Sequence, residues 1–484
     1  MASETDRLDT QPPGAAKPVR PAPDWVVLTI ACIAQFMVVL DVSIVNVALP
    51  SMQRDLHFSF SSAEWVVNAY VLTFAGFLML GGRAADIFGR RRVYLAGMAL
   101  FVIASFGAGF SSSGTQLISI RAIQGLAGAI VSPATLTIIV TTFRGPRLPK
   151  AIGAWSAVAG AGGAFGALLG GVLTGYASWR WVFFINVPIG IIAIVAALRY
   201  LREMRNQEAV VKLDVTGAAL VTASLTAVIY AIVRSTDWGW GSRSTLTWLG
   251  GGVAGLIVFI FWEARVASHP LVPFRIFKSR SLSTANVTML FIGGTFFSMW
   301  YFLTFYFQNI LHYDAVKAGF AFLPMALSII VGAQISSRVI SRIGVRPMLI
   351  TGASLATLGF LWISKLKVHS TYAANLLAPS IICALAMGLL FAPLATAATQ
   401  GVDRADAGLA SGLLNTSRQV GGSLALAALA TAATDRSDTF ANPVSPIAHV
   451  AGYQRAFQIS AVVTLVALGV SLLVPRSAGT AAGD

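Results

Sequence analysis

Long apolar stretches alternate with short polar connectors along nearly the whole chain. Each stretch has about 18 residues or more, which is enough for a helix to cross the hydrocarbon core of a bilayer. The pattern therefore predicts an all-α polytopic membrane protein with fourteen transmembrane helices. Their expected limits are 25–49, 64–82, 93–111, 115–138, 151–173, 181–200, 215–234, 245–264, 284–308, 318–338, 345–364, 376–399, 407–432 and 454–475.

Composition and charge agree with a membrane protein. Only 11% of the 484 residues are charged, against about a quarter in soluble domains. The net charge of +15 would suit a nucleic-acid binder, but most of the 34 Lys and Arg residues fall in connectors on one predicted side of the membrane. The positive-inside rule accounts for this bias. We therefore expect a multi-pass protein of the inner (cytoplasmic) membrane, with both termini cytoplasmic and no nucleic-acid partner.

An internal repeat organises the spans. The segment Gly81–Gly97 aligns with Ser336–Gly352, so that Gly89 meets Gly344. Both copies follow an even-numbered span, which implies parallel halves related by a pseudo-twofold axis along the membrane normal. The copies lie eight spans apart, so two extra helices separate two halves of six.

The repeat predicts five regions along the chain. They are a disordered cytoplasmic tail, a six-helix half, a linker with two extra transmembrane helices, a second six-helix half and a short cytoplasmic tail, at 1–24, 25–202, 203–282, 283–475 and 476–484.

The connector between the second and third spans reads GGRAADIFGRRR. Glycine permits a tight reversal there, and the charges lie where helix ends meet the membrane interface. Two interpretations are open: a topology anchor with local charge pairing, or a conformational latch that pairs with a neighbouring helix end. The residues concerned are Gly82, Asp86, Gly89, Arg90 and Arg91.

Together with the repeat, this connector resembles the signature loop of the major facilitator superfamily. The stretches Leu40–Pro50, Arg121–Ala134 and Trp179–Gly190 are similar to its 14-spanner drug:proton antiporter branch. The resemblance covers about residues 25–475. It implies the major facilitator fold and the export of drugs or antibiotics in exchange for protons by alternating access, with the proton gradient as energy source and no cofactor.

The fifth span contains a glycine-rich stretch that is similar to the antiporter motif of that branch. In the family pattern a Gly-Pro pair precedes two glycines, whereas here Ala167 follows Gly166, which removes a bend. Taken alone, such a stripe more often serves helix packing than function. The motif glycines are Gly162, Gly163, Gly166, Gly170 and Gly171.

Asp41 is the only one of the nineteen acidic residues that the pattern places well inside a span. Such a charge is costly and normally lines a cavity or has a partner. A rise of about 1.5 Å per residue puts Arg121 at a similar depth, and in the fold that the chain resembles both spans line the cavity. Burial favours a protonated carboxyl and a nearby arginine favours a carboxylate. We expect Asp41 and Arg121 to couple proton movement, the alternative being a purely structural pair.

Polar and aromatic residues in other spans are candidates for a substrate cavity. Arg418 is a second charge inside a span, without an acidic partner in its own half, and it could bind backbone carbonyls, an anionic group of the substrate or a group across the cavity. The ninth span is rich in aromatic residues on two faces, and the pattern does not decide which face lines the cavity. The candidates are Gln35, Asn46, Gln124, Trp300, Tyr301, Phe305, Asn415, Arg418 and Gln419.

Several absences narrow the function further. Spans 318–338 and 407–432 lack a membrane-centred acid, so the resemblance favours neutral, zwitterionic or monocationic lipophilic substrates. The five histidines show no metal-ligand spacing, and no phosphate-binding loop supports ATP drive.

Uptake of a small metabolite by a transporter of the same fold is the alternative to export. A membrane-embedded enzyme would need paired acids or a nucleophile and base. We therefore expect a non-enzymatic transporter that functions as a monomer in the lipid bilayer and binds no metal.

Overall fold

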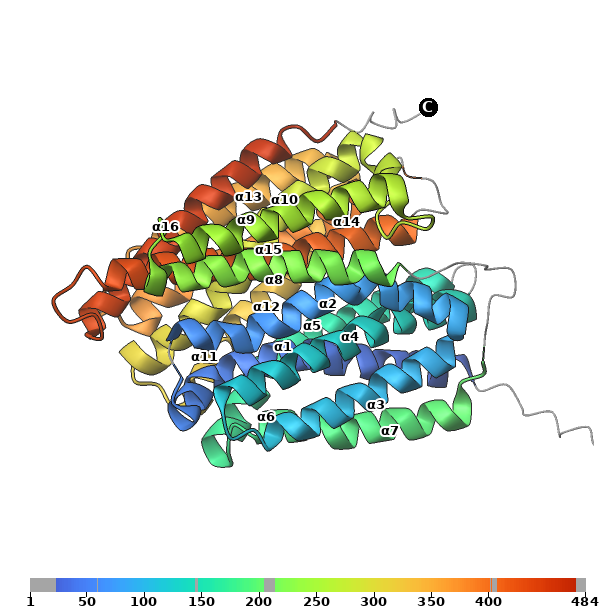
Figure 1. Ribbon diagram of the computed structural model, residues 1–484, viewed down its shortest axis with the longest axis horizontal. Coiled ribbons are helices and arrows are strands. Elements are labelled where there is room, and N and C mark those ends of the chain that lie inside the picture. Colours follow the sequence, from blue (N-terminus) through green and yellow to red (C-terminus); the bar gives the residue numbers. More distant parts are fainter. Residues whose placement is uncertain are drawn as a thin grey trace, which may run out of the picture.

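The computed structural model describes residues 23–58, 60–143, 147–203, 214–400, 402 and 407–475. Within these ranges every regular element is a helix, and the long helices run side by side along the molecule (Figure 1). The predicted tails lie almost entirely outside the described residues, and the domain boundaries stay predictions.

The first six predicted spans correspond to seven helices, because the sixth span divides at Ile185. The helices are α1 (Asp24–Leu56), α2 (Phe60–Phe88), α3 (Arg90–Gly109), α4 (Gly114–Thr142), α5 (Arg147–Tyr176), α6 (Trp181–Phe184) and α7 (Asn186–Tyr200).

The two predicted extra spans are α8 (Val215–Trp238) and α9 (Arg243–Phe261), which continues as η1 (Trp262–Val266). The second half again has more helices than spans, because short helical segments precede or extend several of them. It consists of η2 (Phe274–Lys278), α10 (Arg280–Phe305), η3 (Tyr306–Ile310), α11 (Ala315–Ala321), α12 (Leu323–Ile343), α13 (Val345–Ile363), η4 (Tyr372–Leu376), α14 (Leu377–Thr399), α15 (Ala407–Ser437) and α16 (Pro446–Ser471).

The prediction of fourteen spans is confirmed, since each one coincides with a helix or with consecutive helical segments. In a search of the described residues, eleven of these are long and apolar enough to cross a membrane. The largest error in a boundary is at the last span, which begins at Pro446 rather than 454. There Ser445 accepts a hydrogen bond from the backbone N–H of Ala448, and proline occupies the first helical position, so the helix starts in a polar segment.

The two halves repeat one packing pattern. In the first half α1 packs against α5, α2 against α4, and α3 against α4 and α7. In the second half the corresponding pairs are α10 with α15, α12 with α14, and α13 with α14 and α16. Helix α8 packs against both α2 and α15, and it lies between the two halves in Figure 1. The 6+2+6 arrangement of parallel halves is therefore confirmed.

The aligned glycines of the repeat adopt the same backbone conformation. Gly89 joins α2 to α3 with φ of 98°, and Gly344 joins α12 to α13 with φ of 86°. Both values lie in a region that is open to glycine and strained for other residues. A tight reversal between two helices therefore explains why glycine occurs at both positions.

The halves contact each other where α1 and α5 end and α11 begins. Gln308 of η3 donates a hydrogen bond to the carbonyl of Val47 at 2.8 Å, and a Cβ on Gly171 would lie 2.3 Å from the carbonyl oxygen of Ala315. We call this contact region the seam. It comprises Val47, Glu64, Gly171 and Gly175 of the first half and Tyr301, Gln308, Ala315 and Val316 of the second.

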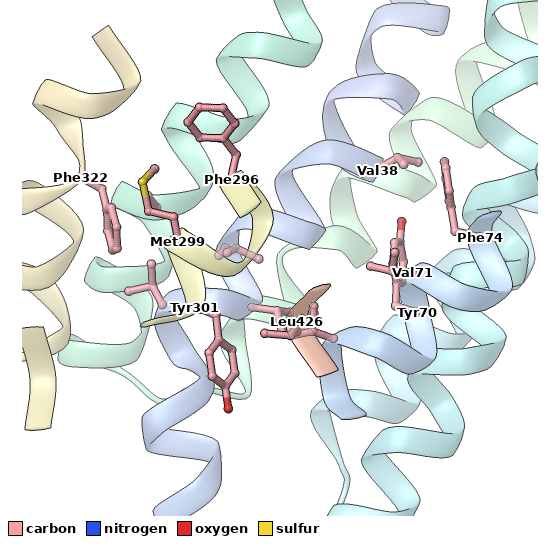
Figure 2. Close-up of a cluster of buried hydrophobic side chains, with 14 of the residues drawn as sticks. Val38, Tyr70, Val71, Phe74, Phe296, Met299, Tyr301, Phe322 and Leu426 are labelled. Atoms are coloured by element: carbon pink, nitrogen blue, oxygen red, sulfur yellow. The ribbon is translucent and has the colours of Figure 1, made fainter. Parts of the chain in front are cut away.

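A continuous hydrophobic core runs through both halves behind the seam. Figure 2 shows part of it, where Tyr70 and Val71 of α2, Phe296 and Met299 of α10, and Leu426 of α15 are labelled. Core side chains from both halves meet here, so the halves share buried surface in this conformation.

Candidate functional site

Asp41 lies near the middle of α1 and has no exposed surface. Its Oδ2 forms an ion pair with Nη1 of Arg121 on α4. Its Oδ1 accepts two hydrogen bonds, from Gln124 Nε2 at 2.7 Å and from Asn186 Nδ2 at 3.0 Å. The contact that the depth estimate predicts between Asp41 and Arg121 is therefore present.

Arg121 has further contacts that fix its guanidinium. Its Nε donates to the carbonyl of Val66 at 3.1 Å, and its Nη1 donates to Gln124 Oε1 at 2.7 Å. The guanidinium also lies over the ring of Tyr70, with its central carbon 4.3 Å from the ring centroid. The Arg121 side chain is 1% exposed, so water does not reach the ion pair in this conformation. Removing one partner would leave a buried charge uncompensated.

Ser105 of α3 orients the two amides that face Asp41. Its Oγ accepts hydrogen bonds from Gln124 Nε2 at 3.1 Å and from Asn186 Nδ2 at 3.0 Å, and donates to the carbonyl of Phe183 at 3.1 Å. The site thus combines side chains of α1, α3, α4 and α7, all from the first half.

This arrangement is suited to binding and releasing a proton. The arginine and the two amide donors stabilise the carboxylate of Asp41, whereas removal from water favours the protonated acid. A movement that admits water or displaces Arg121 would change the balance between the two forms.

Two members of this network were not predicted from the sequence. Asn186 lies inside the stretch Trp179–Gly190 that resembles the antiporter branch, so a signal existed. Its position depends on the division between α6 and α7 at Ile185, which the apolar pattern does not show. Ser105 carries no signal, because a serine in an apolar helix is common. Gln124, which we expect at the substrate cavity, belongs to this network, because it donates a hydrogen bond to Asp41.

The other cavity candidates of the first half have local partners. Gln35 is buried, and its Oε1 accepts a hydrogen bond from Ser132 Oγ at 2.9 Å. Asn46 is also buried and donates to the carbonyl of Val42 in its own helix at 2.9 Å. Their assignment to the cavity stays a prediction.

The aromatic candidates of the ninth span differ in exposure. Tyr301 and Phe305 are buried, with ring centroids 4.9 Å apart. Trp300 is partly exposed and packs against Phe322, with ring centroids 4.8 Å apart. Trp300 is therefore the most accessible of these three candidates.

Arg418 lies in α15, half-buried, beside the exposed Asn415. Its guanidinium carbon is 5.8 Å from the ring centroid of Phe391, and its Nε has no hydrogen-bond partner among the described residues. Gln419 is also half-buried. The described part of the chain places no acidic side chain in an ion pair with Arg418, so its substrate-contacting role stays a prediction.

The connector between α2 and α3 binds the end of α7. Arg91 Nη2 donates to the carbonyl of Leu198 at 2.6 Å and its Nε to that of Ala197 at 3.4 Å. The Arg91 backbone N–H donates to Glu203 at 3.3 Å. Arginine at a helix C-terminus satisfies free carbonyls there. A contact with a neighbouring helix end is thus present, as a latch requires.

The remaining residues of that connector are less informative. Gly82 faces Pro133 of α4, with room for a Cβ at 3.5 Å. Arg90 is half-buried. The Asp86 side chain lies outside the described residues, so its predicted pairing is untested.

The glycines of α5 face two different helices. A Cβ on Gly166 would lie 2.6 Å from Ser43 Cβ, and one on Gly170 would lie 2.8 Å from the carbonyl oxygen of Ile44. Gly162 faces the same helix, α1. These three glycines, one turn apart, let α1 and α5 approach closely.

The other two motif glycines behave differently. Gly171 faces α11 of the second half across the seam, whereas a Cβ on Gly163 would have no neighbour within 4 Å. The glycine motif therefore supports packing within the first half and contact between the halves.

Two further carboxyl groups are buried, although the pattern places both at span ends. Glu64 at the start of α2 is 1% exposed, and Glu263 in η1 is 4% exposed. Glu263 accepts a hydrogen bond from the backbone N–H of Val272 at 2.9 Å. A search of the described residues finds no cluster of three or more metal-ligating side chains.

Comparisons with known proteins agree with this architecture. The model of the Major Facilitator Superfamily matches residues 31–426. The chain is 41% identical to the cephamycin export protein CmcT of Amycolatopsis lactamdurans, over 87% of each chain. It is 36% identical to the puromycin resistance protein pur8 of Streptomyces alboniger, over 93% of this chain and 89% of that one.

A crystal structure of an autoinhibited peptide transporter of the POT family superposes with a TM-score of 0.67 at 13% identity, covering 95% of this chain and 99% of that one. The nucleoside transporter NupG superposes with a TM-score of 0.64 at 13% identity, covering 93% of this chain and 100% of that one. At such low identity these structures support the fold alone. Family match, close relatives and fold agree: the chain is a multi-pass membrane protein that belongs to the major facilitator superfamily.

Proposed function

We propose that this transporter exports lipophilic antibiotics or drugs across the cytoplasmic membrane in exchange for protons, by alternating access. The substrates are neutral, zwitterionic or monocationic, the energy source is the proton gradient, and no cofactor or metal takes part. The chain works as a monomer, with both termini in the cytoplasm, and it catalyses no covalent chemistry.

The buried network around Asp41 is the observation that carries this proposal. A carboxyl held by Arg121, Gln124 and Asn186 without exposure to water is costly, and such groups in membrane helices mark proton pathways. In a second helix arrangement the same carboxyl would meet water on the other side and exchange its proton there. The names of the relatives, an export protein and a resistance protein, support a drug-like substrate.

The direct test uses everted vesicles from a host that lacks its own exporters. Respiration acidifies the vesicle interior, and a pH-sensitive dye then reports proton release when ethidium or puromycin is added. We expect Asp41→Asn to abolish this substrate-driven proton movement while the protein still folds and inserts. Full coupling in that variant would remove Asp41 from the mechanism.

A matched control separates charge loss in general from loss of this carboxyl. Asp237 is 53% exposed at the end of α8 and pairs with Arg234. Asp237→Asn makes the same chemical change, and we expect normal coupling. The same vesicles report direction: ethidium that moves together with protons, and not against them, would favour uptake instead of export.

A further inference from the structure

Glu64 is a buried carboxyl that the Asp41 network does not use. It lies in the second turn of α2 and is 1% exposed, and neither oxygen has a hydrogen-bond partner among the described residues. Asn68, one turn further along, is fully buried, and both polar atoms of its amide also lack partners there. Most buried polar side chains in folded proteins are hydrogen-bonded. Two such groups on one face of one helix therefore need an explanation.

In the described part of the chain, no cationic side chain forms an ion pair with Glu64. Tyr301 of α10, in the second half, interacts electrostatically with Glu64 across the seam. Figure 2 shows Tyr301 extending away from the labelled side chains around it, with its hydroxyl at the far end. Arg121 of α4, a helix that packs against α2, is directed at Asp41 and at the carbonyl of Val66.

Other titratable groups near this end of α2 have partners elsewhere or lie at the surface. None forms a hydrogen bond or an ion pair with Glu64 in the described part of the chain. They are Arg54, Asp55 and His57 at the end of α1, Tyr230, Arg234 and Asp237 on α8, Asp435 and Arg436 on α15, and Tyr453 on α16.

Electrostatics then decides the state of Glu64 in this conformation. A carboxylate without a counter-charge or a hydrogen-bond donor is far more costly to bury than the neutral acid. Closing the seam therefore costs much less free energy when the Glu64 carboxyl is protonated than when it is ionised. Asp41 differs, because Arg121 and two amides stabilise its carboxylate.

We propose that Glu64 is a second proton-binding site, and that the seam closes only after its carboxyl has taken up a proton from the water on the outer side. This inference rests on the proposed alternating access, in which the seam faces outward. The carboxylate accepts one proton from the outer water, the neutral acid is buried as the halves meet, and the proton returns to the same side when they separate.

Such a proton crosses no membrane. It adds nothing to the number of protons exchanged per substrate, which the Asp41 site sets. It makes the return of the empty transporter to the inward-open state faster at acidic external pH, when a proton gradient is available to drive export. Glu64 would thus act as a sensor of external acidity at the seam.

The test measures seam opening without substrate, in purified full-length protein in lipid nanodiscs. Spin labels are placed at Tyr176, which is 82% exposed, and at the exposed Lys317, on the two sides of the seam, with Cys32 and Cys383 replaced by serine. All variants carry Asp41→Asn, so that the carboxyl of the Asp41 network does not titrate. The distance between the labels is measured by pulsed electron paramagnetic resonance at about pH 5 and about pH 9. These two values bracket the pH range in which buried carboxyl groups commonly titrate.

We expect the separated, long-distance population to grow at least several-fold from the acidic to the basic pH. Adding Glu64→Gln should abolish the change and leave the seam closed at both values, whereas Glu64→Asp should retain it. Asp237→Asn should also retain it. A pH response that survives Glu64→Gln, or no response before that change is made, would overturn the proposal. The vesicle assay of substrate-driven proton movement tests the export proposal separately. Failure of that proposal can therefore be told apart from failure of the Glu64 proposal.

Discussion

At the scale of single residues, the Asp41 site depends on which side chains donate to each carboxylate oxygen. Asn186 donates to Oδ1 at 3.0 Å, and a hydrogen bond to a charged group contributes about 1.5–3 kcal/mol. Asn186→Ala removes a donor that favours the ionised form, so proton release should require more alkaline conditions. We expect the pH for half-maximal substrate-driven proton movement in vesicles to rise by about one to two units, since 1.36 kcal/mol is about one unit.

The second half contains a matched control for that change. Asn286 of α10 is also buried, with 5% exposure; it donates to the carbonyl of Leu282 and accepts a hydrogen bond from Ser417, both in the second half. Asn286→Ala should leave the pH profile in place, whatever it does to the maximal rate. A profile that does not move in Asn186→Ala would mean that Asn186 serves packing alone.

At the scale of elements, the close contact of α1 with α5 depends on particular glycines. In Gly170→Ala the new Cβ would meet the carbonyl oxygen of Ile44 at 2.8 Å, and a backbone atom cannot move aside as a flexible side chain can. Overpacking of this kind costs about 1–3 kcal/mol. We expect a lower thermal midpoint of unfolding in detergent.

Gly163→Ala is the control for Gly170→Ala in the same helix. Its Cβ would enter open space, and alanine favours a helix by about 1 kcal/mol over glycine. The midpoint should stay the same or rise. Equal destabilisation by both changes would show that α5 needs flexible glycine throughout, and not close approach at one face.

The connector between α2 and α3 allows its two interpretations to be separated. Arg91→Ala removes bonds to the carbonyls of Ala197 and Leu198, so we expect a loss of about 1–3 kcal/mol in stability and slower efflux. Arg92 is 77% exposed and lies 3.7 Å from Glu203, so Arg92→Ala should cost less than about 1 kcal/mol.

Arg91→Lys then distinguishes an anchor from a latch. Lysine keeps the positive charge that sets topology but cannot reproduce the planar fork of donors that binds two carbonyls. A latch predicts that efflux of ethidium from cells stays low in Arg91→Lys, at normal protein levels in the membrane. Full recovery of efflux would support the anchor.

At the scale of the whole molecule, the fold was largely predictable and the site was predictable in part. Apolar run lengths fix the number of helices, and the alignment of Gly89 with Gly344 fixes the parallel halves. Depth along a helix follows from its rise, which is why the Asp41–Arg121 contact could be expected. The rotation of each helix about its axis does not follow from the rise. The membership of Gln124 and Asn186 in the network therefore needed the structure.

Burial at span ends was also beyond the sequence. Glu64 lies near the start of its span. It is buried in this conformation, and Tyr301 of α10 in the second half interacts electrostatically with it. The exposure of such a residue depends on how the halves meet, and this changes during alternating access.

That dependence leads to a prediction for the seam itself. A Cβ on Gly175 would lie 3.8 Å from the Cβ of Val316, within the range of about 3.5–4.5 Å that disulfides require. In a background without Cys32 and Cys383, the double variant Gly175→Cys/Val316→Cys should form a disulfide that joins α5 to α11. If the halves must separate here in each cycle, oxidation should abolish ethidium efflux and reduction with dithiothreitol should restore it.

A second cysteine pair tests whether any cross-link at this end of the molecule would have the same effect. A Cβ on Gly114 would lie 3.4 Å from the Cβ of Phe58, and both residues belong to the first half. The disulfide of Phe58→Cys/Gly114→Cys joins parts that move together as one rigid body, so efflux should continue after oxidation. Efflux that persists in the oxidised Gly175–Val316 pair would show that transport proceeds with the seam closed. Alternating access by separation of the halves at the seam would then be wrong for this protein.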